Sequence, residues 1–521
     1  MKSEYSYIES LLRTGEIDAA EARLNELKAA NPEQEYLWIL AGQVCQIKGD
    51  LPGMLAMAQQ AVAVAPNSFF AGLFRVEASF LNGQYGSLAG WLTDLENGAQ
   101  NDAAKLQQIA IFYVRLERHA CAKRCYERAL SLSKDKPVEI LYNLAMAESA
   151  LGALDRAETL LDQVILARPD DYSAYYNRSN LRTQTAERNH IAQLKGQLDR
   201  HTVQPEAAVQ LGFALAKELE DLSDYSAAFR YLKQAADLRR NGLSYQVTED
   251  IETMQEIRAA MQGDFFAGVT QQQTSVAEQP CPIFILGQPR SGTTLVDRII
   301  SSHSQVESLG EINDFVVAFM QQFGRVERKS QLIEQSVTLD FDKLGAAYLN
   351  AVRHRGNGQA YFIDKTPSNY LYIGLIAKAL PQAKIIHLRR NPMDSCYAMY
   401  KTLFQMGYPY SYSLEDLGQY YVEYLKLMSH WRTQLPGRVF DVDYESLVRE
   451  QEVISRQLLA YCDLDWDDAC LNFHTNQSPS STASVAQVRQ PIYQSSINKW
   501  QHFEAELEPL KQAFVRAGVT L

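Results

Sequence analysis

The sequence lacks the long apolar runs that would place it in a membrane or in the secretory pathway. No window approaches the about 18 consecutive apolar residues that a membrane-spanning helix needs, so we expect no membrane span. The opening residues, MKSEYSYIESLLRTGEID, contain no apolar core of signal-peptide length. We therefore expect no secretory leader and a cytoplasmic location.

An excess of basic residues is also absent. The chain of 521 residues carries 62 acidic and 50 basic side chains, a net charge of −12 at pH 7. This balance argues against a nucleic acid or an anionic membrane surface as the main partner. It does not exclude a small anionic ligand, because a few local cations are enough to hold one.

Cysteines are few and scattered. The seven form an odd set in a large chain, which is typical of reduced thiols in a cytosolic protein. Cys121 and Cys125 are four residues apart near His119, but no second pair of ligands follows. A packed helix face explains this spacing better than a metal site, and we predict no metal.

The length of the chain predicts two or three domains, and its first half contains a repeat. Gly15, Gly49 and Gly83 recur at intervals of 34 residues, and Pro32 and Pro66 each lie 17 residues after a glycine. A period of 34, with glycine between paired helices and proline at the end, is typical of tetratricopeptide repeats.

The same offset returns at Gly152 and Pro169, and a last helical pair is expected near 205–240. Between them, around 85–137, the pattern degrades, and Arg118 stands where a glycine is due. We predict an all-α tetratricopeptide-repeat solenoid over residues 1–263, with a plain helical bundle as the alternative.

The second half of the chain has a different pattern. Residues 264–280 break the helical periodicity and are predicted to be a linker. Beyond them, short apolar runs alternate with longer amphipathic segments, at 282–286, 361–363, 383–388 and 438–442. This alternation indicates an α/β domain over 281–521, with a mostly parallel sheet and crossover helices.

The first predicted strand runs directly into the loop GQPRSGTT (287–294) and then into a helix. The spacing is that of a phosphate-binding loop, in which backbone N–H groups and a helix N-terminus cradle the anion. Thr293 occupies the position of the usual lysine, which serves a γ-phosphate, and Arg290 offers a cation instead. The loop therefore favours a single 5′-phosphate over a nucleoside triphosphate, and a P-loop kinase is a weaker alternative.

The segment PRSGTT resembles the 5′-phosphosulfate loop of sulfotransferases that use 3′-phosphoadenosine 5′-phosphosulfate (PAPS). The resemblance is closest to tyrosylprotein sulfotransferases and to bacterial proteins that join tetratricopeptide repeats to such a domain. It implies a P-loop-like domain in which the following loop residues bind PAPS: Arg290, Ser291, Gly292, Thr293 and Thr294.

Five further segments extend the resemblance. HSQVESLGE (303–311) matches the segment of the catalytic glutamate and implies Glu311, and DKTP (364–367) implies Lys365 as the catalytic lysine. HLRRNP (387–392) implies that Arg390 binds the 3′-phosphate. RQPIY (489–493) and the pair at 499–500 resemble the C-terminal cover of the cofactor, implying Arg489 and Lys499.

Two positions depart from the family pattern. The family has a serine for the 3′-phosphate eight residues beyond the arginine, and Ala398 stands there. Arg489 or Ser395 is expected to replace that contact. The tyrosylprotein enzymes have two adjacent acids where this chain has Glu311 followed by Ile312.

The chemistry agrees with the resemblance. Sulfuryl transfer is an in-line displacement that needs a base for the acceptor hydroxyl and a cation at the leaving oxygen. Glu311 and Lys365 are the candidates for these roles. We predict a PAPS-dependent sulfotransferase that needs no metal. A protein tyrosine is one candidate acceptor, and the alternatives are a glycan, a lipid or a small alcohol.

The repeats are predicted to position an acceptor protein, peptide or glycan, and the oligomeric state stays open. The alternative from another class is an interaction scaffold with a degenerate sulfotransferase domain, for which Ala398 is the best support.

Overall fold

The computed structural model describes residues 1–201, 204–269, 280–323, 328–404, 407–476, 488–494 and 496–520. Residues 270–279 of the predicted linker lie outside this set. The described chain forms two compact units. One comprises Met1–Lys136 with Asp314–Gln321 and Tyr348–Arg355, and the other comprises the remainder. The domain boundaries expected from the sequence stay a prediction.

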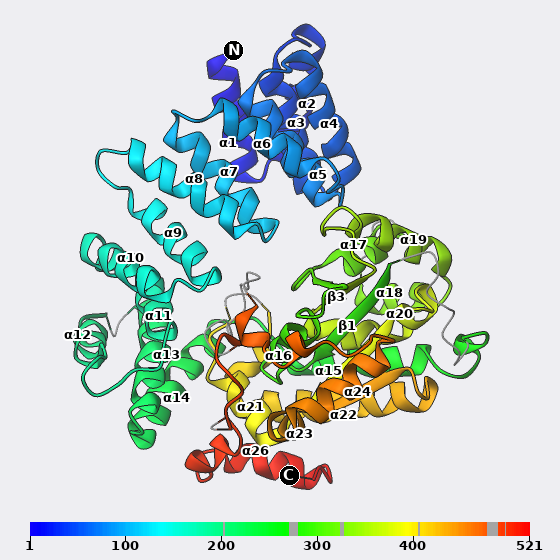
Figure 1. Ribbon diagram of the computed structural model, residues 1–521. Helices are drawn as coiled ribbons and strands as arrows, with labels where there is room; N and C mark the ends of the chain where they lie inside the picture. Colours follow the sequence, from blue (N-terminus) through cyan, green and yellow to red (C-terminus); the bar gives the residue numbers. More distant parts are fainter. Residues whose placement is uncertain are drawn as a thin grey trace. The chain divides into compact units, whose positions relative to one another are not determined.

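The first unit is built on eight helices that pair as hairpins (Figure 1). They are α1 (Lys2–Thr14), α2 (Ile17–Ala30), α3 (Glu35–Ile47), α4 (Leu51–Val64), α5 (Phe69–Leu81), α6 (Leu88–Gly98), α7 (Ala103–Arg115) and α8 (His119–Leu132). The predicted turn glycines Gly15, Gly49 and Gly83 have φ of 81°, 75° and 70°. Only glycine adopts this left-handed conformation without strain, which explains the 34-residue period.

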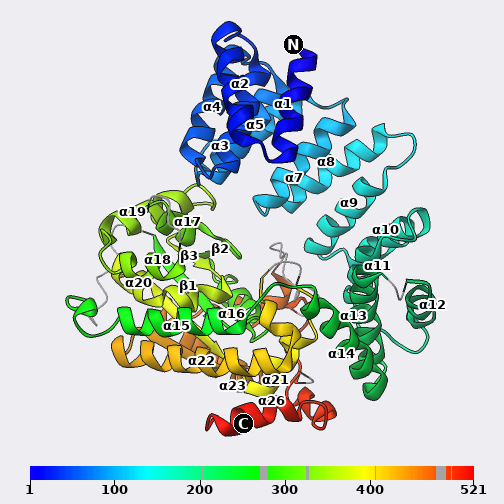
Figure 2. The same cartoon turned by 180° about the vertical axis from the view of Figure 1, so that it is seen from behind.

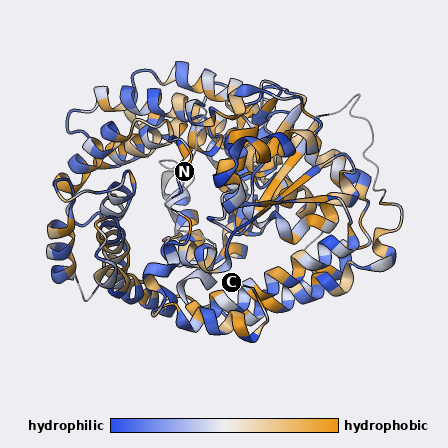
Figure 3. Cartoon of the chain, turned by 60° about the horizontal axis from the view of Figure 1, so that its bottom comes forward, coloured by the Kyte–Doolittle hydropathy of each residue, from blue (hydrophilic) through white to orange (hydrophobic). Residues whose placement is uncertain are grey.

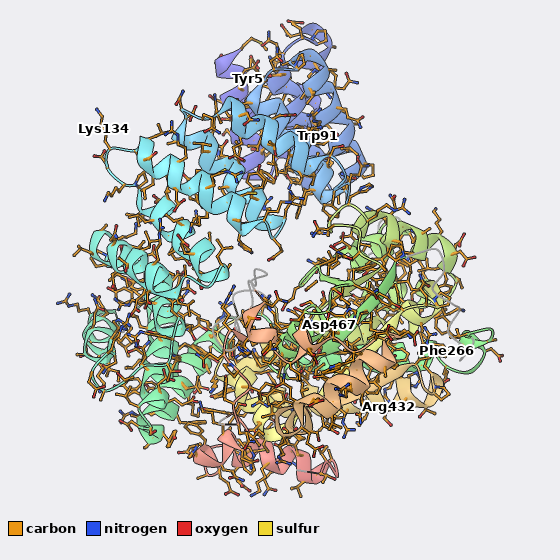
Figure 4. The ribbon with its side chains drawn as sticks, in the orientation of Figure 1. Tyr5, Trp91, Lys134, Phe266, Arg432 and Asp467 are labelled. Carbon is orange, nitrogen blue, oxygen red and sulfur yellow. The ribbon has the colours of Figure 1, made fainter. Side chains whose placement is uncertain are left out.

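Small residues allow close approach between these helices. A Cβ at Gly42 on α3 would lie 2.1 Å from the ring of Phe74 on α5. Trp91 on α6 lies under the Arg75 guanidinium, whose central carbon is 3.9 Å from the ring centroid (Figure 4). The packing confirms the all-helical repeat architecture.

The degenerate turn lies one residue earlier than the sequence predicted. Glu117 has φ of 56°, while Arg118 is the N-cap of α8. Position 118 lies 34 residues before Gly152, whereas position 117 lies 34 residues after Gly83. One extra residue between these turns accounts for the difference.

The first unit also contains α17 (Asp314–Met320) and the end of α19 (Phe341–Val352). The Arg355 guanidinium donates to Asp314 from Nε at 3.0 Å and lies 3.9 Å from the Tyr85 ring centroid. Burial raises the pKa of Asp314, and the positive charge of Arg355 opposes the rise.

The second unit begins with the later repeats. Its helices are α9 (Val138–Ala150), α10 (Leu154–Ala167), α11 (Tyr172–Asn180), α12 (Ile191–His201), α13 (Pro205–Asp221), α14 (Tyr225–Asn241) and α15 (Val247–Ala260). The pair α13 and α14 lies where the last helical pair was expected. A Cβ at Gly212 would be 2.7 Å from Ala235 Cβ, so this glycine lets the two helices pack closely.

Five parallel strands form one sheet in the order β2-β3-β1-β4-β5. They are β1 (Cys281–Gly287), β2 (Val306–Ser308), β3 (Tyr361–Asp364), β4 (Lys384–Arg389) and β5 (Val439–Asp443). The four apolar runs of the sequence are β1, β3, β4 and β5, which confirms the parallel α/β domain. Apolar residues dominate the strands, which are orange in Figure 3.

Helices cover both faces of this sheet. The helices of this part of the chain include α16 (Thr293–Ile300), α18 (Lys329–Ser336), α20 (Ile373–Ala379), α21 (Pro392–Tyr400), α22 (Leu414–Gln434), α23 (Tyr444–Arg449), α24 (Gln451–Tyr461) and α26 (Glu508–Arg516). Of these, α18 packs on α15 and α26 packs on α22. The core joins Ile283 and Ile285 of β1 to Val296 and Ile299 of α16.

Polar pairs tie the repeat helices to α22, which runs beside α15 (Figure 2). Arg240 donates to Asp416 from Nε at 2.7 Å, and Arg258 is paired with Glu423. Among the described residues, no helix combines the length and apolar character needed to cross a membrane.

Candidate active site

The loop after β1 lies at the carboxyl edge of the sheet and depends on two glycines. Gly287 has φ of 148°, and a Cβ there would be 2.8 Å from Leu388 O on β4. Gly292, the N-cap of α16, has φ of 108°, and a Cβ there would be 2.5 Å from the Tyr444 ring. The backbone can therefore turn tightly and direct its N–H groups toward a bound anion.

A cavity of about 530 Å³ opens in front of this loop. That volume is in the usual range for sites that bind small molecules and cofactors. The loop, α21, α23 and the C-terminal segment supply most of its lining. Seven of the predicted site residues line it: Arg290, Gly292, Thr293, Thr294, Glu311, Arg390 and Lys499.

Two other predicted residues lie beside the cavity. Ser291 is buried in the loop, and its hydroxyl has no hydrogen-bond partner among the described residues. Lys365 follows β3 and is paired with Glu311, which follows β2. The neighbouring positions of β2 and β3 in the sheet bring these two groups together across 54 residues of sequence.

The two members of this pair differ in exposure. The Lys365 side chain is 1% exposed, and the Glu311 side chain is 48% exposed and lines the cavity. Buried Asp297 on α16 also interacts electrostatically with Lys365. Burial raises the pKa of Asp297, and the charge of Lys365 opposes the rise. The cation is thus fixed in the interior while the carboxylate faces an incoming group.

Arg390 is held at the edge of the loop. Its Nη1 donates to Arg290 O at 2.9 Å, and its Nη2 donates to Ser496 O at 2.7 Å. Its Nε is buried without a hydrogen-bond partner in the described part of the chain. Burial lowers the pKa of Arg290, and the nearby charge of Arg390 lowers it further. Two adjacent guanidinium groups at one cavity favour an anionic ligand.

The sequence did not identify Lys401, which lines the same cavity as Lys499. Both ammonium groups lie 2.7 Å from Glu220 Oε1, and Tyr397 donates to Glu220 Oε2 at 2.7 Å. Glu220 belongs to the repeat helix α13. No local motif could have indicated a contact between residues 181 positions apart.

The residues expected to replace the family serine lie elsewhere. Ala398 lines the cavity, but Ser395 is buried outside the lining. Arg489 donates from Nη2 to Ala150 O at 3.0 Å, and its guanidinium packs on Gly152 beyond the end of α9. Lys401 and Lys499 are the cations that the structure brings to this part of the cavity.

The tyrosine-rich segment at 401–417 has two roles. Tyr410 stacks on Tyr420 with ring centroids 3.6 Å apart and donates to Gln288 Oε1 at 3.3 Å, so it supports the loop from inside. Tyr408 lines the cavity and interacts electrostatically with Glu311. Lys401 and Phe404 of the same segment also line the cavity, so Phe404 and Tyr408 are its aromatic members there.

Two arginines provide a matched test of the cavity. Arg390→Ala is expected to weaken binding of adenosine 3′,5′-bisphosphate by about 1.5–3 kcal/mol, the range for hydrogen bonds to charged groups. Arg489→Ala is expected to change it by less than about threefold, since that guanidinium is directed at Ala150. Calorimetry on both variants checks the assignment, which fails if Arg489→Ala is the more damaging change.

Comparison with known proteins agrees with this geometry. Residues 282–468 match a family model described as "Sulfotransferase family", and residues 113–182 match a tetratricopeptide-repeat model. An uncharacterised protein of Aquifex aeolicus (strain VF5) is 31% identical over 389 residues, which is 71% of this chain and 49% of that protein. The chain thus spans about half the length of that relative.

A second relative is protein-tyrosine sulfotransferase 1 of Danio rerio, 26% identical over 231 residues, which is 42% of this chain and 65% of the relative. A solved structure, the sulfotransferase domain from the curacin biosynthetic pathway, is 16% identical and aligns with a TM-score of 0.29 over 44% of this chain and 99% of that one. The chain therefore combines a segment that matches the sulfotransferase family, residues 282–468, with a segment that matches tetratricopeptide repeats, residues 113–182.

Proposed function

We propose that the chain transfers the sulfuryl group of PAPS to an acceptor hydroxyl, with a peptide tyrosine as the acceptor. The observation that carries the proposal is the Lys365–Glu311 pair. This pair lies beside a phosphate loop and a cavity lined by cations. The family match of residues 282–468 supports the reaction class.

The cavity fits the donor's charges and size. The loop's N–H groups and the hydroxyls of Thr293 and Thr294 would hold the 5′-phosphosulfate end. Arg390, with an unpaired Nε, would hold the 3′-phosphate together with Lys401 and Lys499. Thr293 stands where a nucleotide kinase has its lysine, which disfavours ATP as the donor.

Glu311 and Lys365 have different roles in the proposed transfer reaction. The acceptor oxygen forms a bond to sulfur as the bond between sulfur and the bridging phosphate oxygen breaks. Glu311, half-exposed, accepts the acceptor's proton. Lys365, buried, neutralises the charge that develops on the bridging oxygen. Adenosine 3′,5′-bisphosphate leaves as the second product.

Two observations favour a peptide tyrosine. The relatives that align over 42% of this chain include proteins named protein-tyrosine sulfotransferase. Repeat solenoids also present extended concave surfaces that suit peptides. Tyr408 at the cavity offers an aromatic ring against which an acceptor ring can pack.

The test supplies the full chain with PAPS carrying labelled sulfur and a panel of tyrosine peptides, matched peptides with phenylalanine, and small alcohols. Mass spectrometry should find sulfate on the tyrosine oxygen alone. Transfer to alcohols but not to tyrosine would overturn the acceptor, and phosphorylated products with ATP would overturn the donor.

Ala398 provides a separate check on the donor. Ala398→Ser would restore the family's hydroxyl, and a neutral hydrogen bond is worth only about 0.5–1.5 kcal/mol. We expect the affinity for adenosine 3′,5′-bisphosphate to change by less than about tenfold. A much larger gain, measured by calorimetry, would mean that the lysines do not compensate for the missing serine.

A further inference from the structure

Glu220 is a repeat residue whose carboxylate contacts the lining of the cavity. It lies near the end of α13, inside the second compact unit, and is almost completely buried. Its Oε1 lies 2.7 Å from the ammonium groups of both Lys401 and Lys499, and its Oε2 accepts from Tyr397 at 2.7 Å. One carboxylate therefore fixes three side chains, all of which line the cavity.

We propose that Glu220 is a positioning residue of the donor site, and that it holds Lys401 and Lys499 where they take the 3′-phosphate. The identity of that ligand rests on the proposed function, whereas the arrangement itself does not. The last repeat hairpin would thus complete the donor site in addition to any role in presenting an acceptor.

The two ammonium groups need a counter-ion before the ligand arrives. They are close to the same oxygen atom, and the Arg290 charge is also nearby, so their mutual repulsion and burial oppose protonation. Burial lowers the pKa of Lys401 to about 8, with Glu220 acting in the opposite direction. Burial also acts to lower the pKa of Lys499, but Glu220, with smaller contributions from Asp221 and Tyr493, raises the value overall.

The pKa of Glu220 lies well below its usual value. Burial alone would raise its pKa, but Lys401 and Lys499 outweigh burial and bring it to about 2. The groups that face Lys401 are Glu220 from α13, Lys499 from the 3-10 helix Lys499–Phe503, Arg290 from the loop, and the Tyr397 ring at 5.0 Å. Glu220 is the acid among them, so it keeps Lys401 cationic.

The direction of the pH dependence follows. Lys401 binds an anion when it is protonated, so affinity for a 3′-phosphate is retained below a pH of about 8 and falls as the pH rises through its pKa. Removing the Glu220 charge lowers the pKa of Lys401 further. The fall in affinity then begins at a lower pH.

The first test compares Glu220→Gln with Glu218→Gln in the full chain. Glu218 lies two residues away on the same helix, is also buried, and is bonded to Ser179 and His190. Calorimetry would measure affinity for adenosine 3′,5′-bisphosphate and for adenosine 5′-phosphate from neutral to alkaline pH.

Glu220→Gln is expected to lose about tenfold or more in affinity for the bisphosphate at neutral pH, the scale of a charge-assisted contact. Its affinity should also fall at a lower pH than in the wild type. Adenosine 5′-phosphate binding and the Glu218→Gln profile should stay close to the wild type. Unchanged or tighter bisphosphate binding by Glu220→Gln would overturn the proposal.

A second variant, Lys401→Met, tests the proposal independently if Glu220→Gln does not fold. Lys401→Met removes one of the two groups through which Glu220 acts, so it should reduce the preference for the 3′-phosphorylated ligand and remove the alkaline fall in affinity. If Lys401→Met retains both, the proposal is wrong. When both variants fold, the double variant should be no weaker than the poorer single variant, because the two act as one unit.

A ligand-free measurement separates this inference from the proposed function. Competitive acylation of amines, read by mass spectrometry, gives the titration midpoint of Lys401 in the wild type and in Glu220→Gln. A lowered midpoint with no binding of the bisphosphate by the wild type would refute the proposed donor and leave the role of Glu220 standing. Binding with an unmoved midpoint would refute the role of Glu220 alone.

Discussion

Lys365→Met is expected to lower turnover by about 10²- to 10³-fold while leaving affinity for adenosine 3′,5′-bisphosphate within a few-fold of the wild type. In the proposed mechanism the lysine acts on charge that appears in the transition state, so its loss should affect kcat more than binding. Steady-state kinetics with labelled PAPS, together with calorimetry, would measure both quantities.

The chain offers a close control for that experiment. Lys384 on β4 is also 1% exposed and is paired with Asp463, which is 49% exposed, at a distance of 2.6 Å. The Lys365 and Glu311 pair has nearly the same exposures. Lys384→Met should therefore reproduce the structural cost of losing a buried strand lysine without affecting the chemistry. Equal loss of turnover in both variants would show that Lys365 is structural.

Glu311→Gln is expected to lower turnover by about 10²-fold or more, since the amide cannot accept the acceptor's proton. Asp463→Asn is the matching control, because it neutralises the acid of the other pair. His303 begins the segment that carries Glu311, but both of its ring nitrogens are bonded to backbone, at Asp465 O and Gln305 N, so it is not available as a base. Near-normal turnover by Glu311→Gln would therefore mean that a different group acts as the base.

The second large effect concerns the repeats. A chain that begins at residue 270 is expected to lose cooperative unfolding and all binding of adenosine 3′,5′-bisphosphate. Repeat side chains are packed into the second unit, where Phe213 meets Tyr412 at 6.2 Å and Phe229 meets Phe503 at 5.8 Å between ring centroids. Each buried aromatic contributes about 1.5–3 kcal/mol, and a whole domain is stable by about 5–15 kcal/mol.

Removing the helices would also leave Lys401 and Lys499 without Glu220. Circular dichroism melts and calorimetry check the two parts of the prediction. A shortened chain that melts cooperatively and binds the bisphosphate as tightly as the full chain would contradict it. The sequence indicated only that the repeats position an acceptor. The structure leads us to expect that they also stabilise the catalytic domain and its donor site.

Helices, turns and strands could be predicted where the spacing of glycines or apolar residues in the sequence shows a regular pattern. The turn glycines follow from left-handed φ values. The strands β1, β3 and β4 follow from apolar runs that are mostly buried, and β5 follows from a run that is half-buried at the edge of the sheet. The edge strand β2 escaped because Val306–Ser308 is too short to show a pattern. The loop and the Lys365–Glu311 pair could be located because each lies at a strand end within a recognisable motif.

The rest of the site could not be predicted, because it depends on contacts between distant segments. Glu220 and Lys401 look like ordinary solvated charges in the sequence, and their meeting depends on how α13 packs beside α21. Arg489 illustrates the opposite case. Its motif placed it near the cofactor, but the direction of its side chain toward Ala150 is decided by three-dimensional packing.

The cations at the cavity belong to a chain whose net charge is −12, and this contrast affects how fast the donor arrives. At low ionic strength the field of the whole protein repels an anionic nucleotide, because little salt screens it. Near 0.1 M salt the Debye length is about 10 Å, so the approaching donor senses mainly Arg290, Arg390 and the two lysines. Moderate salt should therefore quicken association, the reverse of the slowing that is usual when opposite charges steer an encounter.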